Sequence, residues 1–242
     1  MDMPTAQTDT DRTLNASAFS RLRADILSCE LLPNERLRIE VLRERYGMGA
    51  SPIREALMRL QAEGLVELEQ NRGFKVSDVS PKKLADLMRT RGEIENIALR
   101  WSLEKGGLEW EANLISSFHR LSKQTKLNDS KPGSISSAWA KAHADFHTAL
   151  MAACDSETLL LICSRLFEQA ERYVTLSIIS NGPKRDDVTE HKHLMRAALN
   201  RNFDRTVELN CAHINRTLGK AAAWLTAHSA PVNLRLVDRR AK

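Results

Sequence analysis

The stretch SPIREALMRLQAEGLVELEQNRGFKV, residues 51–76, decides the fold of the N-terminal part of the chain. In its first half, apolar residues recur at the helical spacing i, i+3, i+4 and i+7, starting from Ile53. This spacing predicts an amphipathic helix over residues 52–63, with Ser51 as its N-cap and Gly64 at its end. In its second half, alternating apolar and polar residues flank a turn at residues 70–73, and this pattern predicts a β-hairpin.

Two more helices are predicted upstream of this stretch. Residues 18–30 place their apolar side chains on one helical stripe, and residues 39–46 form a shorter helix that Gly47 ends. Three helices followed by a hairpin are the order of a winged helix-turn-helix, in which the second helix of the motif enters the DNA groove. The sequence therefore predicts a DNA-binding domain over residues 18–77, preceded by a disordered arm over residues 1–17.

The chain after the short linker at residues 77–79 is predicted to be helical throughout. Ser80 and Pro81 provide an N-cap and a first helical residue. Breaks rich in Gly, Pro, Asn and Ser separate six segments, near 81–105, 109–127, 134–153, 157–180, 184–200 and 202–227. Six helices without strands predict an all-α bundle over residues 80–228, followed by a loose tail over residues 229–242. The predicted fold class is therefore mainly α, with a winged helix-turn-helix before a helical bundle.

Composition and charge exclude several classes of protein. No run of eighteen apolar residues occurs, and the polar N-terminus does not have the pattern of a secretory signal, so we expect a cytoplasmic protein without a membrane span. The four cysteines form no CxxC pair, which argues against a zinc ribbon and a disulfide framework. Residues 18–77 contain 10 Lys and Arg against 9 Asp and Glu. DNA binding must therefore depend on where the cations lie rather than on their sum.

Two sets of residues carry a resemblance to a known family. Pro-Ile-Arg-Glu-Ala-Leu at 52–57, then Leu-x-x-x-Gly-Leu-Val at 60–66 and Arg-Gly at 72–73, resembles the GntR family of bacterial regulators. His-Ala-Asp-Phe-His at 143–147, with two later histidines, resembles the metal-containing ligand-binding (FCD) domain of its FadR subfamily. The resemblance covers about residues 18–220 and is strongest to regulators of glutarate and related dicarboxylate catabolism. It implies a DNA-binding regulator with a ligand-controlled second domain.

The DNA-contacting residues are predicted on the helix at 52–63 and at the hairpin tip. They are Ser51, Arg54, Glu55, Met58, Arg59, Arg72 and Gly73. Arg54 lies near the N-terminal end of the helix, where a guanidinium can pair with guanine O6 and N7, and the family uses this arginine. The alternatives are a solvated arginine at 54 and an ordinary β-turn at 72–73. The family often has Ser or Thr and then Arg where this chain has Gly49 and Ala50, so operator preference does not carry over.

Four histidines are predicted to bind a divalent transition metal, with zinc or nickel favoured. They are His143, His147, His191 and His213. The first two lie four residues apart on one helix, which suits chelation, and the other two match the family's metal positions. The family has Asp where this chain has His143, and neutral imidazoles leave the ion its full charge, which would attract an anion. The alternative is four unrelated histidines; the remaining three, at 119, 193 and 228, are predicted not to bind.

A small carboxylate effector is predicted near Arg91, with Arg172 and Tyr173 as weaker candidates. Arg91 falls on the apolar stripe of the helix that opens the bundle, where a charge is costly unless it is paired. The partner is either a ligand carboxylate, as in the family, or Glu95 one turn later.

The function that these patterns favour is a repressor that a small carboxylate releases from DNA. We expect a homodimer on an inverted-repeat operator, because a single winged helix has too little interface for tight binding. Two alternatives stay open: a regulator that senses the metal itself, and a metalloenzyme. The sequence has no HExxH and no carboxylate in a clear catalytic position, so we do not expect an enzyme.

Overall fold

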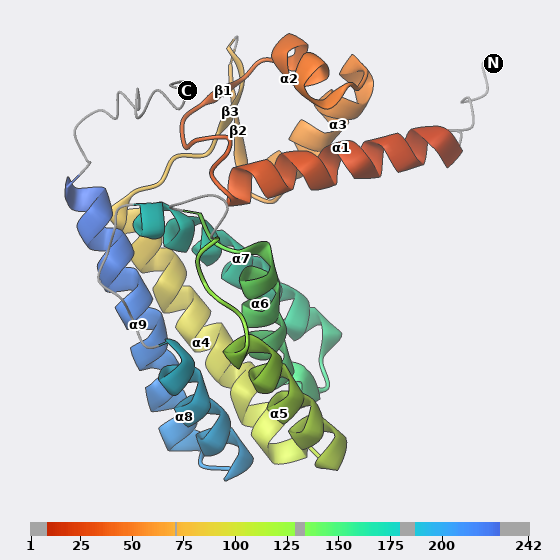
Figure 1. Ribbon diagram of the computed structural model, residues 1–242. Coiled ribbons are helices and arrows are strands. Elements are labelled where there is room, and N and C mark those ends of the chain that lie inside the picture. The colour runs from red at the N-terminus through yellow and green to blue at the C-terminus, as the bar shows by residue number, and fades with distance from the viewer. Residues whose placement is uncertain (1–8, 71, 129–133, 180–186, 228–242) are drawn as a thin grey trace. The chain divides into compact units, whose positions relative to one another are not determined.

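The computed structural model describes residues 9–70, 72–128, 134–179 and 187–227 (Figure 1). The chain divides into two compact units, residues 1–79 and 80–242. The boundary follows directly on the linker that the sequence predicts at 77–79.

The N-terminal unit has three helices and a small sheet. Its elements are α1 (Asp9–Leu27), β1 (Arg36–Leu37), α2 (Ile39–Tyr46), α3 (Ala50–Ala62), β2 (Val66–Glu69) and β3 (Gly73–Val76). The sheet is antiparallel with the order β1-β3-β2. The predicted winged helix-turn-helix is thus present, and β1 is the strand that the sequence did not indicate, because two residues show no alternation.

Two boundaries in this unit differ from the sequence prediction. Helix α1 begins at Asp9, so the second half of the predicted disordered arm is helical, whereas residues 1–8 lie outside the described residues. Those first turns have no apolar stripe, which is why periodicity missed them. The N-cap of α3 is Gly49 rather than Ser51, and it makes no side-chain cap hydrogen bond. Gly47 already ends α2 in the left-handed conformation, with φ 65°, so α3 can start two residues earlier.

The core of this unit lies under α3. Its apolar stripe, which includes Ile53 and Leu57, is buried. It belongs to one cluster with Leu22 and Ile26 of α1 and with Val76 of β3. This packing leaves the opposite face of α3 exposed.

The C-terminal unit is all helical. Its elements are α4 (Pro81–Lys105), α5 (Leu108–Ser122), α6 (Ser137–Met151), a 3-10 turn (Ala152–Cys154), α7 (Glu157–Ile179), α8 (Asp187–Leu199) and α9 (Phe203–Ala227). The Ser80 hydroxyl accepts a hydrogen bond from the Lys83 amide at the start of α4, as predicted. The six predicted helices are present, although α5 and α6 are shorter than expected. The predicted tail at 229–242 lies outside the described residues.

Helix α4 packs against both α7 and α9 and holds the bundle together (Figure 1). Two buried polar side chains join other helices to α6: Ser102 donates to the Met151 carbonyl, and the Trp110 indole donates to the Ala149 carbonyl. Among the described residues, no helix is both long and apolar enough to span a bilayer.

Candidate DNA-binding surface and metal centre

The outer face of α3 carries the predicted DNA-contacting side chains. Ser51, Arg54 and Met58 are exposed, and Met58 is 59% exposed although it is apolar. These side chains lie on the face of α3 opposite its buried stripe, and their contact with DNA stays a prediction. Glu55, on the same helix, is half-buried.

Arg59 makes a contact within the protein that the sequence did not reveal. Its guanidinium carbon lies 4.0 Å from the centre of the Phe19 ring of α1. This cation–π contact joins α3 to α1. Contact of Arg59 with DNA stays a prediction.

The hairpin tip exposes Arg72 and Gly73, and the Arg72 amide donates to the Glu69 carbonyl. Gly73 has φ 81°, a left-handed conformation that favours glycine. Below the tip, the Lys75 ammonium pairs with Glu67 at 3.2 Å and Glu69 at 3.1 Å. The lysine thus neutralises part of the acidic charge of the hairpin.

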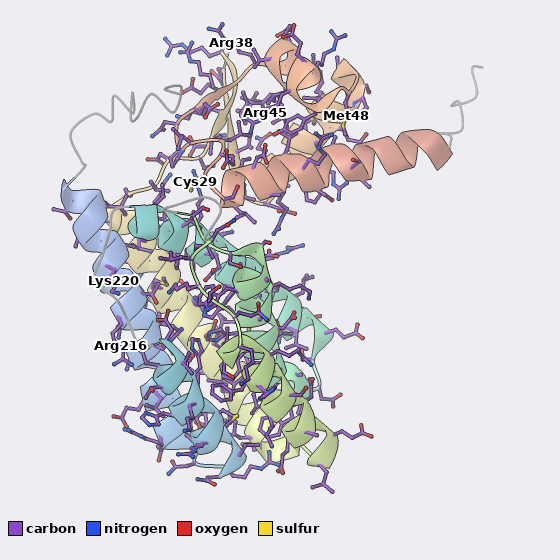
Figure 2. The ribbon with its side chains drawn as sticks, viewed as in Figure 1. Cys29, Arg38, Arg45, Met48, Arg216 and Lys220 are labelled. Atoms are coloured by element: carbon purple, nitrogen blue, oxygen red, sulfur yellow. The ribbon has the colours of Figure 1, made fainter. Side chains whose placement is uncertain are left out.

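Helix α2 is anchored by a polar cluster that sequence analysis missed. The Tyr46 hydroxyl and the Arg45 guanidinium both donate to Asp25 of α1 at 2.7 Å. Arg21 donates to the Tyr46 carbonyl and lies over its ring. Burial and Asp25 raise the pKa of Tyr46, so the phenol keeps its proton. Arg45 and Met48, labelled in Figure 2, belong to α2 and to the turn that follows it.

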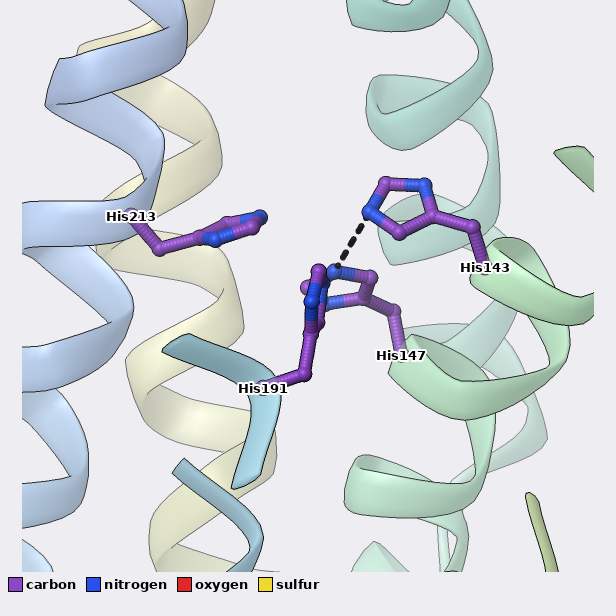
Figure 3. A group of neighbouring side chains, drawn as sticks. All are labelled: His143, His147, His191 and His213. Carbon is purple, nitrogen blue, oxygen red and sulfur yellow. Dashed lines mark hydrogen bonds between the residues drawn. The ribbon is translucent and has the colours of Figure 1, made fainter. Parts of the chain in front are cut away.

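The four predicted metal-binding histidines come together in the C-terminal unit (Figure 3). They are His143 and His147 of α6, His191 of α8 and His213 of α9, all buried, and one nitrogen from each lies within 4.8 Å of the others. The Nε2 atoms of His143 and His147 are 3.2 Å apart. Two ligands at 2.0–2.1 Å from a tetrahedral zinc are separated by about 3.4 Å, so this pair is spaced for one ion.

Burial keeps the first two imidazoles neutral. It lowers the pKa of His143 and His147 well below the ordinary value, and the neighbouring histidines lower it further. A neutral imidazole has a free lone pair for a metal. Trp139 stacks on His143, with ring centres 4.5 Å apart, and Phe167 and Phe146 complete the apolar wall.

The outward-facing nitrogens of the cluster have oxygen neighbours. Nδ1 of His191 donates a hydrogen bond to the Asp187 carbonyl at 2.5 Å, and Nδ1 of His213 lies 3.2 Å from the Glu190 carboxylate. Such contacts turn the other nitrogen, Nε2, toward the centre.

The two remaining histidines within the described residues, His119 and His193, are exposed, whereas His228 lies outside them.

Arg91 is buried and paired with Glu95, the alternative that the sequence had left open. The Arg91 Nε to Glu95 Oε1 distance is 2.5 Å, and the Asn210 amide donates to the other oxygen of Glu95. The Arg91 guanidinium also lies 4.8 Å from the centre of the Phe167 ring, beside the histidine cluster. Its Nη2 atom is buried and has no hydrogen-bond partner among the described residues. Arg172 and Tyr173 are buried on α7.

Two further charged residues adjoin the cluster and were not predicted. Burial raises the pKa of Glu171 to about 7, and its carboxyl oxygen is 3.7 Å from His143 Nδ1. Lys126 pairs with Asp187 and lies 4.6 Å from the centre of the Trp139 ring. Neither has a periodic or motif signal, because both act through contacts between distant segments.

Comparison with known proteins places both units in one family. The family described as "Bacterial regulatory proteins, gntR family" matches residues 14–76, and the FCD domain matches residues 86–216. The regulator BphR of Paraburkholderia xenovorans, described as uncharacterized, is 40% identical over 207 residues, covering 86% of this chain and 84% of its own. The chain belongs to the GntR family. It is a transcriptional regulator rather than an enzyme.

Two further comparisons agree with this placement. The transcriptional repressor GlaR of Escherichia coli is 34% identical over 197 residues, covering 80% of this chain and 89% of its own. The solved structure of E. coli McbR/YncC has a TM-score of 0.69 at 19% identity, covering 89% of this chain and 98% of that chain. This likeness concerns the fold alone. The chain therefore combines a GntR helix-turn-helix with an FCD domain of the FadR type.

Proposed function

We propose that this GntR-family regulator is a cytoplasmic homodimeric repressor, released from an inverted-repeat operator by a small carboxylate that binds beside a metal ion. The observation that carries the proposal is the buried cluster of four imidazoles next to an incompletely paired arginine. GlaR is a repressor, and this favours repression over activation for the present chain.

The donor set fits a divalent transition metal. Four imidazole nitrogens suit zinc, nickel, copper or iron, and zinc and nickel are the ions we favour. His143, His147, His191 and His213 would hold the ion. When bound, the ion supplies positive charge that four neutral ligands do not cancel, and thereby attracts an anion.

Arg91 is the residue proposed to bind the effector carboxylate. Its Nε is used by Glu95, but its buried Nη2 still requires an acceptor. Leaving such a donor unpaired costs about 1–3 kcal/mol, which an anionic ligand would recover. Arg172 and Tyr173, both buried on α7, are further candidates for the same ligand. Glutarate is the first effector to test, given the resemblance to dicarboxylate-responsive regulators.

The test compares operator release by glutarate in wild type, His147→Ala and His193→Ala. We expect metal at one equivalent per chain in wild type and in His193→Ala, whose histidine is exposed on α8. His147→Ala should lose metal and stay on the operator when glutarate is added. Wild type without bound metal, or normal release by His147→Ala, would contradict the metal-assisted model.

The second candidate is a regulator for which the ion itself is the signal. Four protein ligands favour it, because they can fill a tetrahedral shell without an effector. A glutarate titration at saturating metal separates the two. Release that follows metal concentration alone, with no response to any carboxylate, would favour metal sensing.

A further inference from the structure

The neighbours of His213 form a chain of contacts that leads from the histidine cluster to the surface. Nδ1 of His213 lies 3.2 Å from Oε2 of Glu190, and Oε1 of the same carboxylate lies 3.1 Å from Nε of Arg216. The side chain of His213 is 9% exposed, that of Glu190 is 17% exposed and that of Arg216 is 50% exposed. The Glu190 carboxylate therefore connects the buried His213 to Arg216, which is in contact with solvent.

The backbone explains why these groups meet. His213 and Arg216 are three residues apart on α9 and so lie on one face of that helix. Glu190 directly precedes His191 on α8, which packs against α9. His191 is buried in the cluster, while the Glu190 carboxylate contacts α9. Figure 2 labels Arg216 on the outer part of α9.

We propose that Glu190 is a positioning residue for the metal site, held in place by Arg216; this inference rests on the proposed metal function. The carboxylate accepts the Nδ1–H of His213, so the lone pair of Nε2 faces the other three histidines. Arg216 fixes the second oxygen and thereby the direction of the first. None of the four candidate ligands is a carboxylate. The Glu190 carboxylate instead supplies negative charge to the site indirectly, through its hydrogen bond to His213.

A purely structural link between α8 and α9 would use the same contacts, and zinc affinity distinguishes this role from positioning of a metal ligand. Loss of a purely structural link would change the melting temperature of the metal-free protein and leave the affinity of the folded protein for zinc unchanged. A positioning carboxylate should change zinc affinity, because removing such a partner typically weakens metal binding about 10–100-fold.

The experiment measures zinc affinity by competition with a chromophoric chelator in full-length Glu190→Ala and Glu190→Gln, with the visible spectrum of the cobalt form as a second measurement. Glu190→Ala should bind zinc roughly 10–100-fold more weakly and alter the cobalt spectrum. Glu190→Gln keeps an acceptor without the charge, so its loss should be smaller. Glu208→Gln, an exposed acid of α9 paired with Arg205, is the matched control and should bind like wild type.

Arg216→Gln tests the outer contact. Alone it should weaken zinc binding several-fold, and in the Glu190→Ala background it should add no further loss, because it acts through the missing carboxylate. Wild-type zinc affinity in Glu190→Ala, or the same loss in Glu208→Gln, would overturn the assignment while leaving the metal site intact. Failure of the wild-type protein to bind zinc or cobalt would overturn the proposed function and this inference together.

Discussion

At the scale of single residues, burial decides what each charged or polar group can do. Arg54 and Arg91 are both arginines on helices, yet Arg54 is exposed and Arg91 is 4% exposed. The exposed guanidinium is available to a base edge, whereas the buried one must find its partners inside the protein.

Arg54→Ala should weaken operator binding by about 1–3 kcal/mol, because one bidentate contact to guanine is lost. Stability should change little, since the side chain faces solvent. A gel-shift titration on operator and random DNA measures the effect, with Arg89→Ala, an exposed arginine of α4, as control. An equal loss on both DNAs would reduce Arg54 to a phosphate contact.

Cys163 should be inert toward thiol reagents in the folded protein. Burial, helped by the nearby Glu95 carboxylate, raises the pKa of its thiol to about 12. At pH 8 only about one molecule in ten thousand would then have the reactive thiolate. In a disulfide-exchange assay with a chromogenic reagent, the half-buried Cys211 should supply the fast phase. Cys163→Ser should leave that phase intact and Cys211→Ser should remove it; the reverse pattern would contradict the prediction.

At the scale of elements, the bundle depends on contacts that join one helix end to the next. Arg201, in the turn between α8 and α9, donates to the Leu103 and Gly106 carbonyls at the end of α4. It also pairs with Glu111 at 2.6 Å and lies 4.6 Å from the centre of the Trp110 ring of α5. A single guanidinium therefore holds the ends of three helices together.

Arg201→Ala should lower the free energy of unfolding by about 1–3 kcal/mol, through lost charge-assisted hydrogen bonds. Residue 201 has φ 54°, and alanine shares this strain with arginine, so the difference reports on the head group. Denaturant unfolding provides the measurement. Arg205→Ala, at an exposed site of the same region, should change stability by less than about 0.5 kcal/mol; equal effects of the two variants would count against the contact.

At the scale of the whole molecule, the proposed metal would join helices that are distant in sequence. The four histidines lie on α6, α8 and α9, so an ion would hold these helices together. Binding to the folded state alone stabilises it in proportion to the logarithm of ligand excess.

Removing metal with a chelator should therefore lower the melting temperature of the wild-type protein by roughly 5–10 °C, if the ion is present at a hundredfold its dissociation constant. His147→Ala should already melt at the lower temperature and should respond little to the chelator. Scanning calorimetry with and without added zinc measures both. An unchanged wild-type melting temperature would show that the site does not bind metal in the folded protein.

The protein should sediment as a dimer at micromolar concentration. Two winged helices on two half-sites supply the interface that one lacks, and dimer symmetry predicts an inverted repeat. Analytical ultracentrifugation, with and without a full operator, tests this. A monomer that binds one half-site with the full affinity would contradict it.

The sequence by itself determined the elements and the family. Periodicity and turn residues predicted the helices and the hairpin, since these signals lie within a few neighbouring residues. The string at 51–76 and the histidine pattern predicted the GntR and FCD matches. Three features were missed: the first turns of α1, the two-residue β1 and the Gly49 cap. The first two lack an apolar pattern, and the cap depends on how the preceding turn closes.

The tertiary structure decided which side chains meet. It paired Arg91 with Glu95, gathered four histidines from three helices, and brought Glu190 and Glu171 beside them. These contacts depend on the packing of helices that are far apart along the chain, and no local spacing records that packing. Burial then set the chemistry, because the same imidazole or carboxyl group has a different pKa and a different need for partners once water is excluded.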